Sequence, residues 1–525
     1  MTSAFLSGLP LSAQVAAHIL RQQARRIGEH IFVSCNGKDI SYAEADQRAD
    51  RVAAAFHALG IAKGERVALL LHNRVEYLDL WFGMSRIGAI QLPLNTAYKG
   101  LQLVHTLKRA PVAVIVVEDA LLPELEGVID QIEQLKCVVV LGNAKPQCNC
   151  NYLFYRDIFS MTAVPPRVDI SGADVGAIMN TSGTTGPSKG VLLSHAQQYI
   201  LGRNIVNDMA LTADDVYYNF FPLFHNTAQA MITLPVLLVG AKMVLIDRFS
   251  ATRFWPDVRA HGCTAFYYIG EILRILLKST STADGVGTKL RIGWGIGASA
   301  ADFLEFQTRH QVAMRTGYGS TEGNVGVYLS HEKPNLASVG RPLPGFEVRI
   351  AGEDNDPLPP GKTGEILVRG SEPCTTLLGY DGDPAATLAA WKDLWFHTGD
   401  SGYLDADGNL FFTGRVKDGI RVRGENVSAF EIEQVIAQID GVMEVAAIAV
   451  PCELGGDDVK VVVTTHTQLD APTLLAHAQQ HLPKFAVPRY VEFVAALPKT
   501  ETNKVRKNVL RETPFTPTTW DRLKM

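Results

Sequence analysis

Residues 181–190, TSGTTGPSKG, form the stretch of the chain that is best suited to chemistry. The stretch lies between the apolar runs 175–179 and 191–193, which predicts a loop between two short strands. Its glycines leave backbone N–H groups uncovered, its serines and threonines add hydroxyl donors, and Lys189 adds one ammonium. These hydrogen-bond donors and this positive charge are suited to binding a polyphosphate. A polar surface linker is the alternative interpretation. The pattern GxxxxGK[ST] is absent, because Ser188 stands where the second glycine is required.

Three later stretches also carry side chains that could bind a nucleotide or a metal ion. Residues 316–324, TGYGSTEGN, combine glycines with an aromatic ring and a carboxylate, that of Glu322. Residues 395–400, WFHTGD, end in a second carboxylate, and residues 498–507, PKTETNKVRK, contain Lys504. A carboxylate next to a triphosphate would repel it unless a divalent cation lay between them. For Glu322, the alternative role is a helix N-terminal charge.

Taken in this order, the motifs resemble those of the adenylate-forming superfamily, which holds acyl-CoA synthetases, peptide-synthetase adenylation domains and beetle luciferases. The resemblance extends from residue 41 to Lys504, nearly the whole chain. The sequence RGENVSAFEIE at 423–433, together with the pair Asn503 and Lys504, is most similar to the crotonobetaine/carnitine-CoA ligase-like branch. In the superfamily, the residue before this lysine is commonly glycine. Asn503 departs from this pattern, but asparagine tolerates positive φ better than other non-glycine residues.

The resemblance implies a two-step reaction with ATP, Mg²⁺ and coenzyme A. A carboxylic acid is first activated as an acyl adenylate with release of pyrophosphate, and its acyl group then passes to coenzyme A with release of AMP. The implied catalytic residues are Lys504, Glu322, His225 and Thr184, of which Glu322 and Thr184 bind Mg²⁺. The implied cofactor-binding residues are Thr181, Ser182, Gly183, Thr184, Thr185, Gly186, Lys189, Gly297, Ala298, Gly317, Tyr318, Gly319, Thr321, Asp400, Arg415, Arg423 and Gly424.

Within this set, the resemblance gives several residues individual roles. Tyr318 stacks on adenine, Asp400 accepts hydrogen bonds from both ribose hydroxyls, and Arg415 is a second ribose contact. Lys417 is the hinge about which a C-terminal domain turns. Arg423 and Gly424 belong to the loop that enters the site for the thioester-forming step.

The segment 220–229, FFPLFHNTAQ, is implied to form a wall of the acyl pocket, with His225 beside the carboxylate and the thiol tunnel. A histidine that caps the following helix is the alternative, and the spacing alone favours it. The segment lacks the aspartate that peptide-synthetase domains use to hold an α-amino group, and the chain stops soon after Lys504. Free coenzyme A is therefore the expected acceptor.

Two further patterns leave alternatives open. Gly293, Gly295 and Ala298 satisfy GxGxx[GA], which is typical of a dinucleotide-binding turn and would suit a nicotinamide-dependent dehydrogenase. In the resembling family, this glycine turn instead lets adenine and the acyl chain approach the backbone closely. Tyr267, together with Tyr268 and Trp294, could surround a quaternary ammonium or form the apolar wall of an acyl pocket. We expect the wall. A catalytically silent binding protein of the same fold is a third hypothesis.

The elements expected around these residues alternate between helix and strand. Helices are predicted at 12–30, 41–60 and 75–87, the second opened by a capping box of Ser41 and Glu44. Strands are predicted at 67–71, 89–94, 112–117 and 137–141, and this alternation is typical of parallel sheets in an α/β protein. The resemblance implies a large N-terminal domain, residues 1–414, with two α/β sheet subdomains and a small β-barrel. A small mobile α+β domain, residues 415–525, would carry the catalytic lysine.

Composition narrows the class of protein. The chain has 525 residues, 47% of them hydrophobic, and a net charge of −5, so no bulk basic field attracts nucleic acid. Seven scattered cysteines predict reduced thiols in the cytoplasm, with Cys148 and Cys150 as loop thiols. No signal peptide is expected. Pro235 and Lys242 interrupt the most apolar stretch, 230–246, which predicts buried core and no integral membrane segment. A homodimer is compatible with the resemblance.

Overall fold

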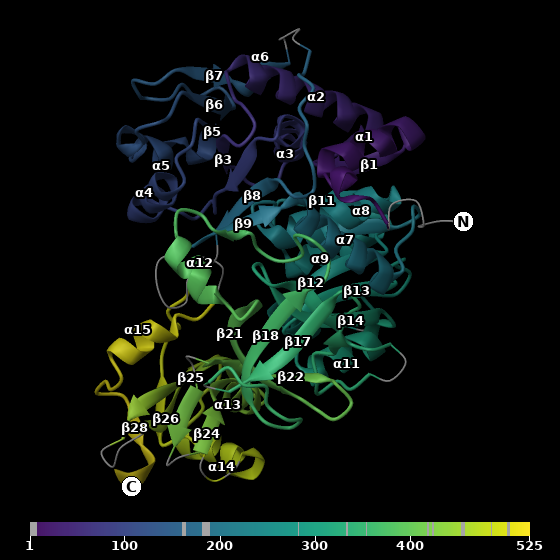
Figure 1. Ribbon diagram of the computed structural model, residues 1–525. Coiled ribbons are helices and arrows are strands. Elements are labelled where there is room, and N and C mark those ends of the chain that lie inside the picture. The colour runs from purple at the N-terminus through teal and green to yellow at the C-terminus, as the bar shows by residue number, and fades with distance from the viewer. Residues whose placement is uncertain are drawn as a thin grey trace.

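The structure is a computed structural model that describes residues 8–159, 164–180, 189–281, 283–331, 334–352, 354–416, 419–422, 425–452, 457–482, 484, 486–500 and 504–524. A large body holds three sheets, and a smaller body below it holds the C-terminal end (Figure 1). The alternation of strands and helices predicted for an α/β protein is confirmed.

The first sheet of the large body has nine strands within the described part of the chain, in the order β16-β15-β14-β13-β12-β10-β11-β1-β2. The run from β14 to β1 is parallel, and β15, β16 and β2 add antiparallel edges. Its strands are β1 (Ile31–Cys35), β2 (Lys38–Ser41), β10 (Val216–Asn219), β11 (Lys242–Leu245), β12 (Ala265–Ile269), β13 (Ile292–Ile296), β14 (Ala313–Ser320), β15 (Asn324–Tyr328) and β16 (Arg341–Pro342).

The second sheet has eight described strands in the order β19-β9-β8-β4-β3-β5-β6-β7, and β4 to β7 are parallel. Its strands are β3 (Arg66–Leu70), β4 (Ile90–Pro93), β5 (Val114–Glu118), β6 (Cys137–Leu141), β7 (Tyr152–Phe154), β8 (Val175–Asn180), β9 (Gly190–Ser194) and β19 (Gly379–Tyr380). The predicted strands at 67–71, 89–94, 112–117 and 137–141 correspond to β3, β4, β5 and β6.

The helices of the large body lie between and around these two sheets (Figure 1). They are α1 (Ala16–Ile27), α2 (Tyr42–Ala58), α3 (Val75–Ile87), α4 (Gly100–Arg109), α5 (Leu122–Glu126), α6 (Tyr155–Ile158), α7 (His195–Met209), the π-helical η4 (Thr227–Thr233), α8 (Leu234–Val239), α9 (Ala251–His261), α10 (Gly270–Ser279) and α11 (Ala300–His310), with the short η1 (Leu11–Ala13), η2 (Asp119–Leu121) and η3 (Ile129–Gln131). The helix predicted at 75–87 is α3. The Ser41 hydroxyl accepts the Glu44 N–H, so this half of the predicted capping box is present.

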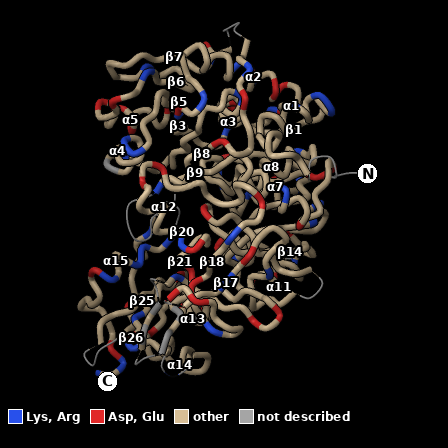
Figure 2. The backbone as a smooth tube through the Cα atoms, in the orientation of Figure 1, with Lys and Arg blue, Asp and Glu red and all other residues tan. Residues whose placement is uncertain are grey.

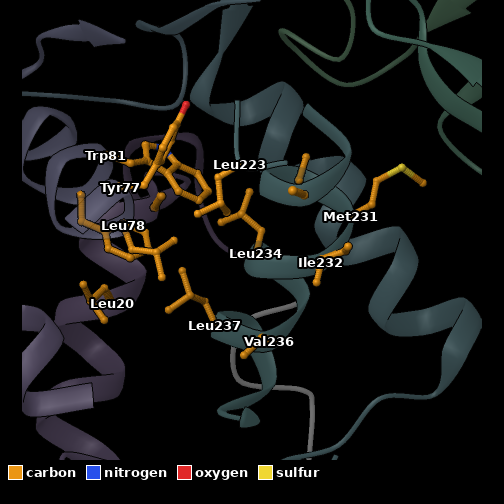
Figure 3. Packing of buried hydrophobic residues seen from close by; sticks show 14 of the residues in the cluster. Leu20, Tyr77, Leu78, Trp81, Leu223, Met231, Ile232, Leu234, Val236 and Leu237 are labelled. Carbon is orange, nitrogen blue, oxygen red and sulfur yellow. The ribbon is translucent and has the colours of Figure 1, made fainter. Parts of the chain in front are cut away.

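The core of the large body lies where helices from the two sheets meet. Figure 3 shows Tyr77, Leu78 and Trp81 of α3 facing Leu234 and Leu237 of α8, and all five side chains are buried. The predicted apolar stretch 230–246 runs through η4, α8 and β11 and is buried core, as expected. Among the described residues, none of the helices has both the length and the apolar character needed to cross a bilayer.

A third, antiparallel sheet joins the large body to the small one. Its described strands are β17 (Phe346–Ala351), β18 (Gly364–Gly370), β20 (Trp391–Lys392), β21 (Trp395–Leu404) and β22 (Leu410–Arg415), with α12 (Pro384–Ala390) beside it. The small body contains β23 (Gly419–Val422), β24 (Glu425–Ser428), α13 (Ala429–Ile436), β25 (Val442–Pro451), β26 (Asp457–Thr465), α14 (Ala471–His481), β27 (Tyr490–Phe493), α15 (Lys507–Glu512), β28 (Trp520–Asp521) and η6 (Arg522–Lys524). The division at residue 414 stays a prediction.

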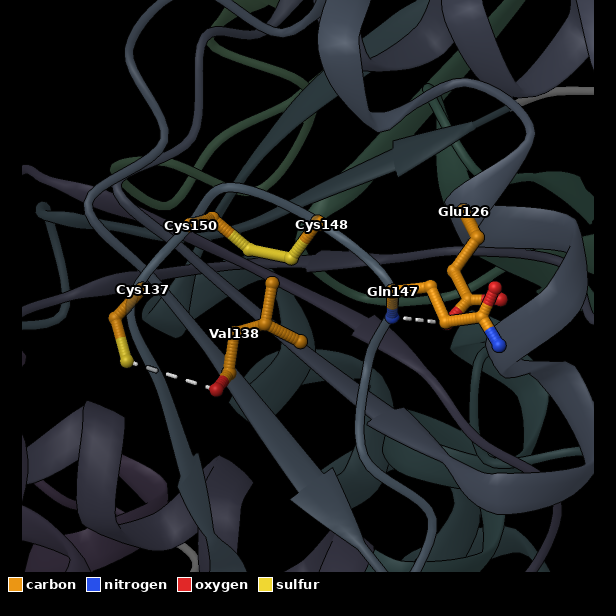
Figure 4. Close-up of a disulfide and its surroundings, with 6 residues drawn as sticks. All are labelled: Glu126, Cys137, Val138, Gln147, Cys148 and Cys150. Carbon is orange, nitrogen blue, oxygen red and sulfur yellow. Dashed lines mark hydrogen bonds between the residues drawn. A yellow bond between two sulfur atoms is a disulfide. The ribbon is translucent and has the colours of Figure 1, made fainter.

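The structure corrects the prediction that Cys148 and Cys150 are free loop thiols. The two residues form a disulfide in the loop between β6 and β7 (Figure 4). Their Cα atoms are 5.3 Å apart, a separation that a disulfide spans without backbone movement. The sequence interpretation considered only a zinc site as a use for the pair, and it overlooked that a loop can bring two cysteines together across one intervening residue. The other five cysteines are free thiols.

Candidate active site

A cavity of about 440 Å³ lies where the carboxyl ends of β13 and β14 meet the third sheet and α13. Such a position, beyond the carboxyl ends of parallel strands, is where α/β proteins commonly bind nucleotides. We call it the nucleotide cavity. Of the residues predicted to bind ATP, those that line it are Gly297, Ala298, Gly317, Tyr318, Gly319, Asp400 and Arg415. Segments that are far apart in the sequence thus form one pocket.

Tyr318, Asp400 and Arg415 are linked to one another inside this cavity. The Tyr318 hydroxyl donates to Asp400 Oδ2 at 2.7 Å, and Arg415 Nε lies 2.8 Å from Asp400 Oδ1. Burial raises the pKa of the Asp400 carboxyl, and Arg415 and the Tyr318 hydroxyl oppose this shift. Asp400 therefore presents a buried carboxylate that is oriented from two sides, a suitable acceptor for paired hydroxyl groups.

The small body closes one side of the nucleotide cavity. Phe430 and Gln434 of α13 line the cavity, and the Phe430 ring packs edge-on against Phe412 of β22 at 5.3 Å between centroids. Phe412 also contacts the ring of Tyr318, with 5.9 Å between centroids. Charged residues of both signs lie along the chain near β18, β20 and β21 (Figure 2).

The glycines of the predicted dinucleotide motif have a different role in the structure. Gly293 and Gly295 lie inside β13, where a methyl group would come within 2.4 Å of the Phe266 ring and 2.1 Å of the Tyr268 carbonyl oxygen. A dinucleotide fingerprint needs its glycines in the turn between strand and helix. In this chain they permit close packing of β13 on β12, so the dehydrogenase hypothesis loses its structural basis. Gly297, with a φ of +74°, forms the turn that lines the nucleotide cavity.

Glu322 lies in the turn between β14 and β15. Helix α7, from much earlier in the chain, holds this turn. Gln197 Nε2 donates to the carbonyl oxygen of Thr321 at 2.9 Å and to that of Glu322 at 3.3 Å. Asn324 Nδ2 donates in return to the Gln197 carbonyl oxygen at 3.1 Å. The main chain of Thr321, a residue predicted to bind the cofactor, is therefore part of this hydrogen-bonded turn.

The Glu322 carboxylate belongs to a cluster at the edge of the nucleotide cavity. Burial raises its pKa, while Arg415 and Lys504 lower it. The Tyr380 side chain hydrogen-bonds to Glu322, and the Lys189 ammonium lies 4.8 Å from the centre of the Tyr380 ring. Lys189, at the end of the predicted phosphate loop, thus lies on the same side of the site as Glu322.

The small body brings Lys504 to this cluster on a hairpin. Lys504 N–H donates to the Thr500 hydroxyl at 3.1 Å, and Thr500 N–H donates to the Lys504 carbonyl oxygen at 2.7 Å. An ion pair of 2.7 Å between Lys507 and Glu433 anchors the segment that follows. Lys504 is exposed at the surface, yet many protein atoms surround it. This crowding and the Arg415 charge lower the pKa of Lys504, and Glu322 and Asp400 oppose the shift.

His225 caps the following helix, the alternative that the spacing favoured, and its role beside the acyl carboxylate stays a prediction. Its Nδ1 accepts the Thr227 N–H at 3.2 Å, so the ring caps the start of η4. The protein atoms around the ring lower the pKa of His225 to about 4, and the Lys504 charge adds to this shift. The imidazole is therefore neutral at neutral pH.

Several predicted site residues lie outside the described part of the chain. They are Thr181, Ser182, Gly183, Thr184, Thr185, Gly186, Lys417, Arg423 and Gly424, with Asn503. The flanks of the predicted phosphate loop are described, and β8 and β9 pair antiparallel with Asn180 opposite Gly190. The two strands predicted on either side of the phosphate loop are confirmed.

Three residues that organise the site were missed by the sequence analysis: Gln197, Asn324 and Tyr380. Gln197 and Asn324 are buried polar residues, and each connects α7 to the Glu322 turn. A signal for Gln197 was available, because a glutamine on the buried face of a helix needs a polar partner. Tyr380 gave no comparable signal, since its contact with Glu322 spans separate segments.

Tyr267, Tyr268 and Trp294 are fully buried and do not line the nucleotide cavity. The Tyr267 and Trp294 rings stack at 5.8 Å, the Tyr268 hydroxyl donates to the Arg315 carbonyl oxygen at 2.7 Å, and Trp294 Nε1 donates to Asp208 at 2.8 Å. The rings fill space against one another, so they form no open cage for a cation.

Comparison with known families gives two matches that together span most of the chain. Residues 20–380 match the family "AMP-binding enzyme", and residues 431–504 match "AMP-binding enzyme C-terminal domain". Among curated proteins, the chain is 32% identical over 493 residues to the crotonobetaine/carnitine–CoA ligase of Proteus mirabilis and 30% identical over 491 residues to that of Salmonella paratyphi B. Each alignment covers 92% of this chain and 95% of the relative.

Two solved structures have a similar fold. ATP-bound MatB from Rhodopseudomonas palustris superposes with a TM-score of 0.84 at 29% identity, over 95% of this chain and 98% of that one. The anthranilate CoA ligase AuaEII, in complex with anthranoyl-AMP, superposes with a TM-score of 0.86 at 24% identity, over 96% and 98% of the two chains. The latter likeness shows the fold alone.

Proposed function

Because the chain belongs to the family of AMP-binding enzymes, we propose that its nucleotide cavity and the Lys504 hairpin together activate a carboxylic acid with ATP. The enzyme is an acyl-CoA ligase: the acid is converted to an acyl adenylate, and the acyl group is then transferred to coenzyme A. The observation that carries the assignment of residues is the meeting of Glu322, Asp400 and Arg415 of the large body with Lys504 of the small one.

The first step needs positive charge near the transferring phosphoryl group. A carboxylate oxygen attacks the α-phosphorus of ATP, the bond to pyrophosphate breaks, and negative charge spreads over the phosphoryl oxygens. We assign the Lys504 ammonium to these oxygens and to the attacking carboxylate, since its charge interacts with those of Glu322 and Asp400 at the site. The neutral ring of His225 beside it adds no competing charge.

Glu322 is proposed to hold Mg²⁺ together with the triphosphate. The described residues contain no group of three or more side chains that could bind a metal by themselves. Mg²⁺ commonly takes one or two carboxylates and completes its shell with substrate phosphates and water, so one buried carboxylate fits. A bound Mg²⁺ would supply neutralising charge to the phosphates. Thr184, a second proposed ligand, lies outside the described residues.

The nucleoside is proposed to lie in the nucleotide cavity, with its ribose hydroxyls on Asp400. The Tyr318 and Arg415 contacts orient that carboxylate before any ligand binds. Preorganised acceptors of this kind reduce the entropy that binding costs. Gly297 lines the cavity, and the space where its side chain would stand is open, which lets the base approach the backbone.

The second step requires the site to change. Lys504 has no role once the adenylate exists, and its hairpin fills space that a thiol needs. We propose that the small body turns about Lys417 and brings Arg423 and Gly424 to the site. These three residues lie outside the described part, so this step rests on the resemblance. We propose a cytoplasmic enzyme, because ATP and coenzyme A are abundant there, and a homodimer stays a prediction for sedimentation analysis.

The test is a pyrophosphate-release screen with ATP and Mg²⁺ across acids that differ in length, ring content and charge. We expect at least one acid to release pyrophosphate, and addition of coenzyme A then to yield AMP and a thioester. Adenylate formation with no thioester would contradict the assignment of coenzyme A as acceptor. Absence of pyrophosphate release with every acid would contradict the proposed function.

A further inference from the structure

A short segment, residues 377–381, connects two predicted parts of the active site. We call it the strap. Its Leu377 N–H donates to the Glu322 carbonyl oxygen at 2.8 Å, so one end holds the turn that carries Glu322. Its Asp381 N–H donates to the Gly190 carbonyl oxygen at 2.8 Å, so the other end holds the chain where the predicted phosphate loop ends. The strap therefore fixes the main chains of both parts relative to each other.

The strap is itself held in place by its neighbours. The Asp381 carboxylate forms an ion pair of 2.6 Å with Arg66 of β3. Strand β19, inside the strap, pairs antiparallel with β9, and Tyr380 stands opposite Val191. The Tyr380 N–H donates to the Thr387 hydroxyl of α12 at 2.9 Å. The Tyr380 side chain therefore extends from a main chain that is anchored on both sides.

The Tyr380 side chain contacts a charged group of each predicted part. The Lys189 ammonium lies over its ring, 4.8 Å from the centroid, which is within the range of a cation–π contact. Its hydroxyl hydrogen-bonds to the Glu322 carboxylate. Burial and the Glu322 charge raise the pKa of Tyr380, so the hydroxyl keeps its proton and is the donor in this bond. One side chain thus contacts the predicted phosphate-binding cation and the predicted metal-binding carboxylate.

The two contacts use different parts of the tyrosine. The face of the ring attracts a cation, and a phenylalanine ring would do the same. The hydroxyl occupies one of roughly four acceptor positions of a carboxylate and leaves the others for a metal ion. Metal-binding carboxylates are commonly oriented by such hydrogen bonds, and loss of the partner typically costs about 10- to 100-fold in metal affinity or activity. The two contacts can therefore be removed one at a time.

We propose that Tyr380 is a positioning residue that couples the metal site to the phosphate site. Its hydroxyl orients the Glu322 carboxylate for Mg²⁺, and its ring orients the Lys189 ammonium for the phosphates of ATP. The inference rests on the proposed function of these two residues. All three side chains belong to the large body, so the unit stays assembled when the small body turns.

Calorimetric titration of the full chain with ATP, in excess Mg²⁺ or in EDTA and without any acid, tests the coupling. Tyr380→Phe keeps the ring and removes the hydroxyl, so it should weaken ATP about tenfold with Mg²⁺ and leave the affinity in EDTA unchanged. Tyr380→Leu removes the ring as well, so it should also weaken ATP in EDTA about two- to fivefold. Wild-type affinity of Tyr380→Phe with Mg²⁺, or an equal loss in both conditions, would overturn the proposal.

A double-mutant cycle tests the ring contact. If the ring acts through the Lys189 ammonium, Tyr380→Leu should cause no further loss in EDTA once Lys189→Met is present, whereas additive losses would reject this contact. Tyr152→Phe, which removes a hydroxyl from an exposed tyrosine on β7, is the matched control and should change neither affinity. Thermal melting of each variant separates lost binding from lost folding.

Steady-state pyrophosphate release adds a readout that a general loss of structure would not reproduce. Tyr380→Phe should need about tenfold more Mg²⁺ for half-maximal rate and should reach the wild-type rate at saturating Mg²⁺. A lower rate at saturation with an unchanged Mg²⁺ requirement would contradict the proposal. If the wild-type protein binds ATP and the Tyr380 variants bind it equally well, the proposed function stands and the coupling is rejected. If the wild-type protein binds no ATP with Mg²⁺, the proposed function fails, and this inference fails with it.

Discussion

The large and the small body contribute opposite charges to one site. The large body contributes Glu322 and Asp400, whose pKa values burial raises, and the small body contributes Lys504, whose pKa crowding lowers. Burial therefore disfavours the charged form of the groups on each side. The opposite charges stabilise one another only while the two bodies are in contact. A site divided in this way can be dismantled by moving one body, without unfolding either.

The two sides also differ in how they are held. The Glu322 turn is fixed by side-chain hydrogen bonds from α7 within the large body, and Asp400 by Tyr318 and Arg415. The segment that holds Lys504 is tied to its own body through Thr500 and the Lys507–Glu433 pair. The large body thus presents a fixed receptor, and the small body carries a removable cation.

Removing the carboxylate on the large side should have the largest effect. Glu322→Ala should lower the rate of Mg²⁺-dependent adenylation roughly a thousandfold, because the triphosphate loses the metal that neutralises it. The measurement is pyrophosphate release against Mg²⁺ concentration, with circular dichroism to verify folding. Wild-type rates in a folded variant would show that Glu322 does not hold the metal.

Removing the cation on the small side should affect one step alone. Lys504→Ala should lower adenylation roughly a hundredfold, since one charged contact to a developing phosphoryl charge is worth about 3 kcal/mol. A supplied acyl adenylate should still be converted to acyl-CoA. Lys484→Ala, an exposed lysine of the same body, is the control and should leave both steps unchanged.

Loosening the turn on the large side should cost less. Gln197→Leu removes two hydrogen bonds to the Thr321 and Glu322 carbonyl oxygens, each worth about 1 kcal/mol, so kcat/KM for ATP should fall about 5- to 30-fold. A positioning role predicts that more Mg²⁺ is needed for half-maximal rate. Exposed Gln134→Leu is the control. An unchanged Mg²⁺ requirement would argue against that role.

The pH dependence should show the smallest effect and reports both sides at once. Glu322 and Asp400 must be ionised, and their raised pKa values move the acid limb of kcat/KM for ATP above the ordinary carboxylate range. Lys504 must be protonated, and its lowered pKa moves the alkaline limb below the ordinary lysine range. The profile should therefore be narrower than for unperturbed groups. Limbs at the ordinary values would contradict the prediction that burial disfavours the charged form of all three groups.

The sequence predicted those parts of the site that are contiguous motifs. Tyr318, Asp400 and Arg415 lie in one cavity, as the resemblance implied. Each belongs to a short motif that can be recognised in the sequence. The helix at 75–87 was predicted with its bounds because an apolar pattern, followed by a glycine at positive φ, defines it.

What the sequence could not supply depends on contacts between distant segments. Gln197 holds the Glu322 turn across more than a hundred residues, and Asp208 meets Trp294 and His331 only in the folded chain. The GxGxx[GA] pattern was ambiguous because glycines serve strand packing as well as phosphate turns. The Cys148–Cys150 bridge was missed because thiol pairing depends on a loop conformation that spacing does not define.

Single-turnover rates of the two half-reactions, measured on Lys504→Ala and Lys417→Pro, test the divided site most directly. Proline at the hinge fixes φ near −65° and removes a backbone N–H, so Lys417→Pro should form adenylate normally and stall in thioester formation. Lys504→Ala should do the reverse, with adenylation slowed about a hundredfold and thioester formation from supplied adenylate preserved. Equal losses in both steps for both variants would contradict the account and indicate one fixed active site.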